Sequence, residues 1–395
     1  MSPHSPCDAA ATCSSSHAAS RECLTVPIPA WRGVDYERIT CCLRCCLLGW
    51  IERLGLTANY DHWRGRGVNF YASNGGGGQR TYASPPPREM PIDAMLLTRF
   101  AIGRFAHFLA IESRDLVSFK EMESASTLKE LRRPQFRVPH HLHKRANGSL
   151  VVLNGWGHSN LLLSRIVRTL PAGPIAMLYG DDVSWTAAEM EDLRSAMGPS
   201  RLVRHFAMNV DSSAVRLSHV SQVPIGLNAA SMDLPDVLRA NGALQSSFSH
   251  RSSRLLCCCQ RAWPQREAAF AALRLAGHAH CNLTDRKPYS SLIQSYLRHR
   301  FVVSVHGHGR TDFREWEILT SGAVPVIDYF EEHDDLFDGL PVVRVRDWSA
   351  VTPEFLDAKW ERLQVESRAG RVDWRKVYLP YWFARYTEHM TPSVA

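Results

Sequence analysis

The segment VSVHGHGRTDFREWEILTSGAVPVID (Val303–Asp328) is the most informative part of the sequence for the fold. The apolar run from Phe301 predicts a buried strand, the glycines after it predict a loop, and Phe313–Ser321 predicts a helix that Gly322 ends. Ala323–Asp328 then predicts a second strand. A strand, a crossover helix and a further strand form the repeating unit of a parallel sheet that helices cover on both faces.

The same alternation continues on both sides of this stretch. Short apolar runs predict further strands at Leu150–Asn154, Ile175–Tyr179, Arg201–Asn209, Val223–Gly226, Arg254–Gln260, His278–Asn282 and Pro341–Asp347. Helical spacing of apolar residues predicts helices at Asp93–Ile111, Trp185–Met197, Pro264–Gly277, Tyr289–Arg300 and Thr352–Ser367. Two successive halves that each alternate strands and helices indicate an α/β protein.

Composition divides the chain into three parts. Residues 1–91 are of low complexity and end in a Gly/Pro-rich linker, so we expect a disordered amino-terminal extension there. A polar break at Ser246–Ser253 separates residues 92–248 from residues 249–395. We therefore expect two α/β domains in tandem, with a cleft between them. Ligands of such folds bind at the carboxyl ends of the strands and between the domains.

Length and charge exclude several classes of protein. The chain has 395 residues, of which 45% are hydrophobic and 22% charged, so it is neither fully disordered nor fibrous. The net charge of +7, from 46 basic and 39 acidic residues, is low for a dedicated nucleic-acid binder but suits a partner that carries phosphates. No run reaches the roughly 20 apolar residues of a membrane-spanning helix. No secretory signal peptide is visible either.

Eleven cysteines gather mainly before residue 47 and in the adjacent trio at Cys257–Cys259. Neighbouring residues of a strand point to opposite faces, so we expect the trio to be small apolar filler and not a disulfide framework. This usage favours a reducing compartment. We expect neither a bound metal nor an organic cofactor.

The loop and helix after the first strand have the composition of an anion site. Gly307 and Gly309 allow a ligand to approach the backbone closely, and the amino terminus of a helix attracts negative charge. Arg314 in the first turn would fork onto a diphosphate, and Glu317 one turn later would accept two hydrogen bonds from a ribose diol. An ordinary intrahelical ion pair behind a glycine loop explains the same spacing.

Six basic residues and one acid occupy Arg286–Arg314, and acids follow from Asp328 to Asp338. The basic run would make the surroundings of the glycine loop positive, as a phosphate pocket requires. Two solvated surface runs are the alternative. A third possibility is a binder of a phosphate-rich polymer that uses the basic run.

These residues resemble the signature of the exostosin-like glycosyltransferases. The shared positions are Phe301-Val302-Val303, Gly307, Gly309, Asp312, Arg314, Trp316-Glu317, Gly322 and Pro325-Val326. The likeness extends loosely over Leu150–Tyr386. The chain departs from the family at Phe313, where a histidine is common, and in showing no amino-terminal membrane anchor.

The resemblance implies a GT-B-type fold, in which two Rossmann-like domains face a cleft. It implies a transferase that moves a sugar from a nucleotide-sugar donor to a glycan or glycoprotein hydroxyl. It implies that the carboxyl-terminal domain holds the donor, with Glu317 on the ribose and Arg314 on the diphosphate. Arg261 and Arg266 would add phosphate-binding charge. Such transfer inverts the anomeric centre without a bound metal, and the family's usual address is the Golgi. A non-catalytic nucleotide-sugar or glycan binder on the same fold is the alternative.

A transferase also needs a base for the acceptor hydroxyl. Asp181 and Asp182 follow a predicted strand directly, where such a base belongs, and His158 is a further candidate. Plain strand-end turns explain these residues equally well. We expect solvated loops, not zinc ligands, for the HHLH motif at residues 140–143 and for the histidines at 306 and 308.

Overall fold

The computed structural model describes residues 108–111, 115–118, 149–154, 175–180, 184–198, 202–227, 251–258, 263–283, 287–307, 309–377, 381–382 and 385. The expected disordered extension of residues 1–91, with its linker, lies outside these residues. Within them, no helix is long and apolar enough to cross a membrane.

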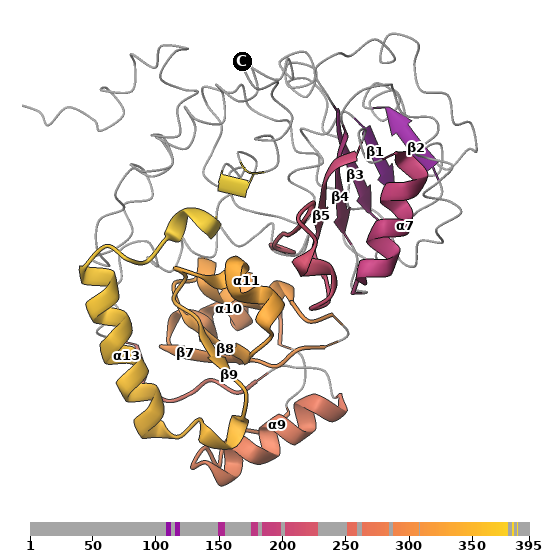
Figure 1. Ribbon diagram of the computed structural model, residues 1–395. Coiled ribbons are helices and arrows are strands. Elements are labelled where there is room, and N and C mark those ends of the chain that lie inside the picture. Colours follow the sequence, from indigo (N-terminus) through magenta and orange to yellow (C-terminus); the bar gives the residue numbers. More distant parts are fainter. Residues whose placement is uncertain are drawn as a thin grey trace, which may run out of the picture.

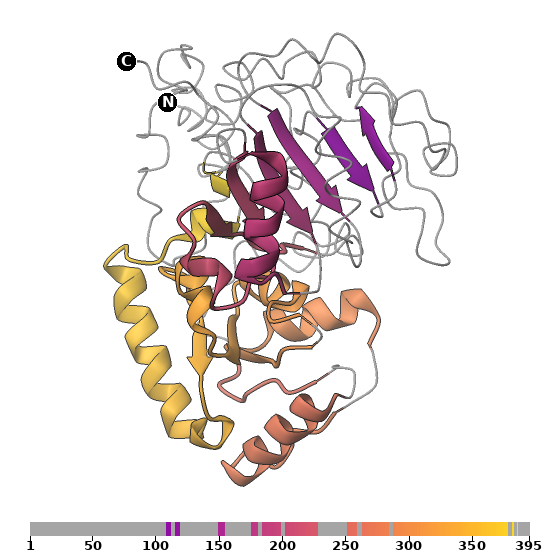
Figure 2. The ribbon, with the colours of Figure 1, turned by 45° about the vertical axis from the view of Figure 1, so that its right-hand side comes forward.

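The first sheet has six strands in the order β2-β1-β3-β4-β5-β6. Its elements are β1 (Phe108–Ile111), β2 (Asp115–Ser118), β3 (Ser149–Asn154), β4 (Ile175–Gly180), α7 (Ala187–Met197), β5 (Leu202–Ala207), a 3-10 turn η6 (Ala214–Arg216) and β6 (Val220–Gln222). All neighbouring strands are parallel except β1 and β2. Helix α7 runs beside β5 (Figure 2). The predicted parallel strands β3, β4 and β5 are thereby confirmed.

The second sheet has three parallel strands in the order β7-β8-β9. Its elements are α9 (Pro264–Leu275), α10 (Tyr289–Leu297), β7 (Phe301–Ser304), α11 (Phe313–Thr320), β8 (Val324–Asp328), α12 (Asp334–Phe337), β9 (Val343–Val345) and α13 (Pro353–Arg368), with 3-10 turns η9 (Glu331–His333), η10 (Trp348–Ala350) and η11 (Trp374–Val377). Figure 1 shows this sheet in orange, separate from the magenta strands of the first. The chain is thus α/β with two largely parallel sheets.

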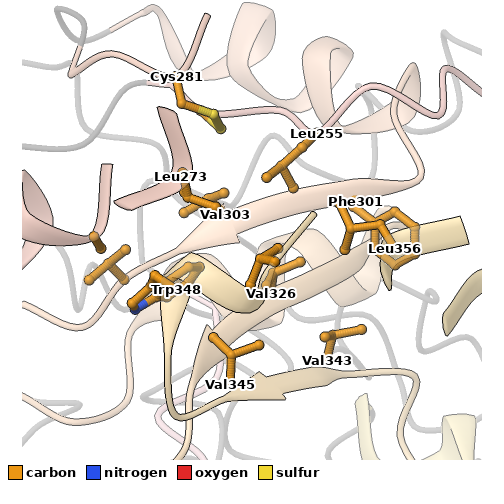
Figure 3. Close-up of a cluster of buried hydrophobic side chains, with 14 of the residues drawn as sticks. Leu255, Leu273, Cys281, Phe301, Val303, Val326, Val343, Val345, Trp348 and Leu356 are labelled. Carbon is orange, nitrogen blue, oxygen red and sulfur yellow. A yellow bond between two sulfur atoms is a disulfide. The ribbon is translucent and has the colours of Figure 1, made fainter. Parts of the chain in front are cut away.

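A buried apolar cluster holds the second sheet and its helices together (Figure 3). Val303 of β7 and Val326 of β8 lie in the cluster with Leu273 of α9 and Leu356 of α13. All four side chains are at most 1% exposed. Burial on this scale contributes roughly 1.5–3 kcal/mol per aliphatic side chain, so the cluster fixes the sheet edge that carries the glycine loop.

Three predicted strands are absent from the described residues, and one predicted helix ends as a strand. His278–Asn282 forms a turn after α9, and Val223–Gly226 has no regular structure. Of the predicted strand Arg254–Gln260, the structure describes residues 254–258, which contribute one isolated parallel bridge, Leu256 with Val302 of β7. Phe108–Ile111, expected at the end of a helix, is β1. Short apolar runs support strand and turn alike, and tertiary contacts decide between them.

The cysteine trio is not merely apolar filler, which corrects the prediction for Cys257. Cys257 forms a disulfide with Cys281 across a sequence separation of 24 residues, with the Cα atoms 5.0 Å apart. Cys258 lies outside this disulfide and is buried. Alternation along an extended segment turns Cys257 and Cys258 to opposite sides, so the partner of Cys257 is a distant residue and not its neighbour.

Candidate functional site

The candidate site lies where β7 and β8 end. After β7 the chain passes His306 and Gly307, and Asp312 then caps the start of α11 with an extended backbone. Strand β8, which pairs with β7 in parallel, ends at Asp328. Carboxyl ends of parallel strands meet at one sheet edge, so the loop after β7 lies next to Asp328.

His306 and Asp328 form a hydrogen-bonded pair at this edge. His306 Nδ1 lies 2.8 Å from Asp328 Oδ2, and the His306 backbone N–H donates to the same oxygen at 2.9 Å. Trp348 Nε1 donates to Asp328 Oδ1 at 2.8 Å. Burial by itself would raise the pKa of Asp328, but these hydrogen bonds outweigh it and hold that pKa below its usual value.

The pair fixes the tautomer of the His306 ring. An ionised carboxylate only accepts hydrogen bonds, so in the neutral ring Nδ1 donates to Asp328 and Nε2 carries the lone pair. The His306 side chain is 29% exposed, so a ligand can reach this ring. A histidine oriented by a carboxylate, with Nε2 as a proton acceptor, has the geometry of a general base.

Arg266 donates hydrogen bonds to both ends of the glycine loop. This buried side chain comes from the first turn of α9, and its Nε donates to the Val305 carbonyl at 3.0 Å. Its Nη2 donates to Asp312 Oδ2 at 3.1 Å. Burial lowers the pKa of Arg266, although Asp312 opposes this shift. Arg266, which the sequence analysis predicted to bind phosphate, therefore donates these hydrogen bonds to residues at the two ends of the glycine loop.

Gly307 lies directly against the end of the Arg266 side chain. A Cβ at Gly307 would lie 2.7 Å from Arg266 Nη2, a distance that real Cβ atoms essentially never show. Gln265 Nε2 donates to the Gly307 carbonyl at 2.8 Å, which fixes the loop from a second side. Gly309, the second predicted glycine, is buried.

Arg314 and Glu317 lie one turn apart on α11, as predicted. Arg314 Nη1 donates to the Tyr296 hydroxyl of α10 at 3.0 Å. Burial would lower the pKa of Arg314, but the negative potential of Tyr296, Asp312 and Glu317 outweighs it and raises that pKa. Glu317 is only 6% exposed. The two residues interact electrostatically. This geometry is consistent with both interpretations of the spacing, an intrahelical ion pair and a ligand-binding pair.

Glu315 is a site residue that the sequence reasoning missed. It occupies the third position of α11, is 2% exposed and accepts a hydrogen bond from the Asp312 backbone N–H. Among the described residues, its Oε2 has no hydrogen-bond partner. Burial, with Asp312 and Asp328 nearby, raises the pKa of Glu315 well above its usual value. The spacing Asp-x-x-Glu, typical of a capping box, was the signal available in the sequence.

The glycine loop also contacts the loop after β5 of the first sheet. Thr311 N donates to Asn209 Oδ1 at 3.2 Å, and Thr311 Oγ1 donates to the same oxygen at 3.1 Å. Both side chains are buried. Asn209 follows the carboxyl end of β5, so the carboxyl ends of one strand from each sheet meet here.

The described basic residues of the run Arg286–Arg314 do not form one cluster. Lys287 and Arg298 are exposed, Arg300 lies over the Trp360 ring, and Arg310 forms an ion pair with buried Glu332. The positive charge beside the loop comes instead from Arg266 and Arg314, which interact electrostatically.

Comparison with solved structures finds distant likenesses, among them the following two. The apo structure of OtsA matches with a TM-score of 0.40 and 9% identity, over 64% of this chain and 74% of the other. The crystal structure of Anabaena Alr3699/HepE in complex with UDP-glucose matches with a TM-score of 0.35 and 8% identity, over 60% of this chain and 77% of the other. Both TM-scores are below 0.5, so neither likeness assigns a fold or a function here. No family model and no curated protein matches the sequence.

Several predicted site residues lie outside the described residues. They are Asp181, Asp182, His158, Arg261, His308 and the HHLH motif. Strand β4 ends at Gly180, directly before the two aspartates, which agrees with the strand end predicted for them.

The described arrangement combines three chemical capacities. Arg314 and the start of α11 offer positive potential to an anion. Glu317 offers a carboxylate one helical turn away. His306 offers a lone pair that Asp328 orients. These are the three capacities that binding of a phosphorylated, hydroxyl-bearing ligand and removal of a hydroxyl proton require.

Proposed function

We propose that this protein is a glycosyltransferase that moves a sugar from a nucleotide-sugar donor to a hydroxyl group of a glycan or glycoprotein. The observation that supports this most is the glycine loop after β7. Arg266 braces the loop, Asn209 bonds it to the end of β5, and it leads into the helix that carries Arg314 and Glu317. In this proposal two Rossmann-like units of a GT-B-type fold face a cleft at that contact.

The donor would bind against α11. We assign the diphosphate to Arg314 and the start of α11, because a guanidinium forks onto phosphate oxygens and the helix dipole favours the same charge. Arg266 acts as a positioning residue, since its described hydrogen bonds hold Val305 and Asp312. Glu317 would accept hydrogen bonds from the ribose diol. These groups stabilise the charge that grows on the leaving diphosphate, so the proposed transfer needs no bound metal.

In the transfer step the acceptor oxygen forms a bond to the anomeric carbon. The bond from that carbon to the diphosphate oxygen breaks, and the electron pair leaves with the nucleoside diphosphate. The hydroxyl proton passes to a base. Among the described residues His306 has this geometry, while Asp181 and Asp182 are the candidates from the sequence. Attack opposite the leaving group inverts the anomeric centre.

Ligand binding tests the donor assignment directly. Thermal-shift and calorimetric titration with uridine, guanosine and cytidine diphosphate sugars, UDP-glucose among them, should show one donor that stabilises the protein. Glu317→Gln should weaken that donor about 10- to 100-fold, the loss expected for hydrogen bonds to a charged group. Glu361→Gln, on the exposed face of α13, is the matched control. Equal affinity in both variants would remove Glu317 from the site.

Turnover distinguishes the enzyme from a binding protein. Mass spectrometry of the bound donor with an acceptor panel should detect transfer, or slow hydrolysis when no acceptor is present. His306→Gln should reduce turnover about 10²- to 10⁴-fold while donor affinity stays within a few-fold. A similar loss in Asp182→Asn with full activity in His306→Gln would move the base to Asp182. Binding without any turnover would favour a non-catalytic nucleotide-sugar binder.

A further inference from the structure

A second set of reactive side chains lies away from the glycine loop. The potential ligand atoms of Cys257, His280 and Cys281 lie within 4.8 Å of one another. Among the described residues, this is the one group of three or more such side chains that could hold a metal ion. Both cysteines are buried, and His280 is partly exposed. We propose that the reduced protein binds one Zn²⁺ at these three residues and that the Cys257–Cys281 disulfide is the oxidised, metal-free state of the same site.

The hydrogen bonding of His280 supports a ligand role. His280 Nε2 lies 2.8 Å from the Leu255 carbonyl oxygen. A carbonyl only accepts, so in the neutral ring Nε2 carries the proton and Nδ1 carries the lone pair. Metal-bound histidines generally hold their second ring nitrogen in this way, with its N–H on a backbone carbonyl or a carboxylate. The ring is therefore fixed in a tautomer that can bind a metal.

The residue types select zinc. Two thiolates and one imidazole are ligands that Zn²⁺ prefers, whereas calcium and magnesium require oxygen ligands. Three protein ligands leave one tetrahedral position, and the partial exposure of His280 allows water to take it.

The redox step balances with an external thiol. Two thiol molecules reduce the Cys257–Cys281 bond, which yields two cysteine thiols and one external disulfide. Zinc binding then releases the two thiol protons, because the metal binds thiolates. Both states join the same parts of the chain, namely the turn after α9 and the extended segment beside β7. The fold is thus compatible with either link, the disulfide or the zinc site.

Cobalt absorption tests the site in the full chain. The protein is reduced with a phosphine, which competes less for metal than thiols do, and titrated anaerobically with Co²⁺ and then Zn²⁺. We expect wild type to show thiolate–cobalt absorption that Zn²⁺ displaces. Cys281→Ser and His280→Gln should lower the affinity of this component at least tenfold, whereas Cys258→Ser should leave it unchanged. Circular dichroism checks that each variant is folded.

Site-resolved alkylation separates this cluster from the other cysteines. Cleavage after Arg274 and Arg286 gives a peptide whose single cysteine is Cys281. In the reduced protein, Zn²⁺ should slow alkylation of Cys281 at least tenfold, and His280→Gln should abolish that protection. Alkylation of Cys281 at the same rate with and without Zn²⁺, or full protection in His280→Gln, would overturn the proposal. The result does not depend on sugar transfer, so the two proposals fail independently.

Discussion

At the level of single residues, three charged positions of α11 have different roles. Arg314 and Glu317 carry the charges predicted from the motif. Glu315, between them, is buried, and this burial together with the charges of Asp312 and Asp328 raises its pKa. The motif indicated Arg314 and Glu317 because their spacing is one helical turn. Glu315 could not be ranked from spacing, since its burial depends on the neighbouring strand end.

Glu315 should make stability fall as the pH rises. Its pKa is raised in the folded state, so above about pH 4.3 the unfolded chain ionises while the folded chain keeps the proton. Each pH unit in that window, up to the folded pKa, then costs about 1.4 kcal/mol. Glu315→Gln keeps an acceptor for the Asp312 N–H and cannot ionise.

We therefore expect Glu315→Gln to raise the melting temperature more at pH 8 than at pH 5. Thermal unfolding across this range measures the difference, and Glu361→Gln on the exposed face of α13 is the control. A pH-independent effect of Glu315→Gln would contradict the raised pKa.

Gly307→Ala should disturb the loop through Arg266. The new methyl group would meet the end of the Arg266 side chain, and overpacking of this kind costs about 1–3 kcal/mol. Urea unfolding should show the loss, together with weaker donor binding. In an Arg266→Met background the same substitution should cost less, because the close approach is gone. Equal costs in both backgrounds would show that the two residues are not coupled.

At the scale of elements, one covalent link joins α9 to the second sheet. The turn after α9 carries Cys281, and the extended segment beside β7 carries Cys257. The sequence predicted α9 correctly from Pro264 at its start and the apolar spacing within it. It predicted a strand at His278–Asn282, because alternation over five residues does not distinguish a strand from a turn that a disulfide fixes.

Reduction of the disulfide should destabilise the fold. A cross-link across 24 residues removes chain entropy worth about 3 kcal/mol from the unfolded state. Urea unfolding in the presence of a metal chelator, with and without reductant, measures this loss. Cys258→Ser should show the same difference as wild type, and Cys257→Ser should show none.

At the scale of the whole molecule, Thr311 and Asn209 join the two sheets. Their hydrogen bonds connect the loop before α11 with the loop after β5, more than a hundred residues earlier. Arg314 and Glu317 lie on the carboxyl-terminal side of this contact. Donor binding and the approach of the acceptor should therefore respond differently when the contact is weakened.

Thr311→Val should separate these two effects. The substitution removes the hydroxyl that donates to Asn209 and keeps the volume, which costs about 1 kcal/mol. We expect donor affinity, measured by calorimetry, to change less than threefold, while transfer to the acceptor falls further. Ser349→Ala, at an exposed hydroxyl of η10, is the control. A parallel loss of donor affinity would place the contact within the donor site.

The local structure around the glycine loop could be predicted from the chain alone. Apolar runs specify β7 and β8, and Gly322 specifies the end of α11, because these features depend on neighbours in the chain. Packing of distant segments brings Arg266 against Gly307, places Asp328 where it orients His306, and brings Cys257 to Cys281. Each of these contacts joins residues more than twenty positions apart, and their partners follow from how the strands pack side by side, which local periodicity does not encode.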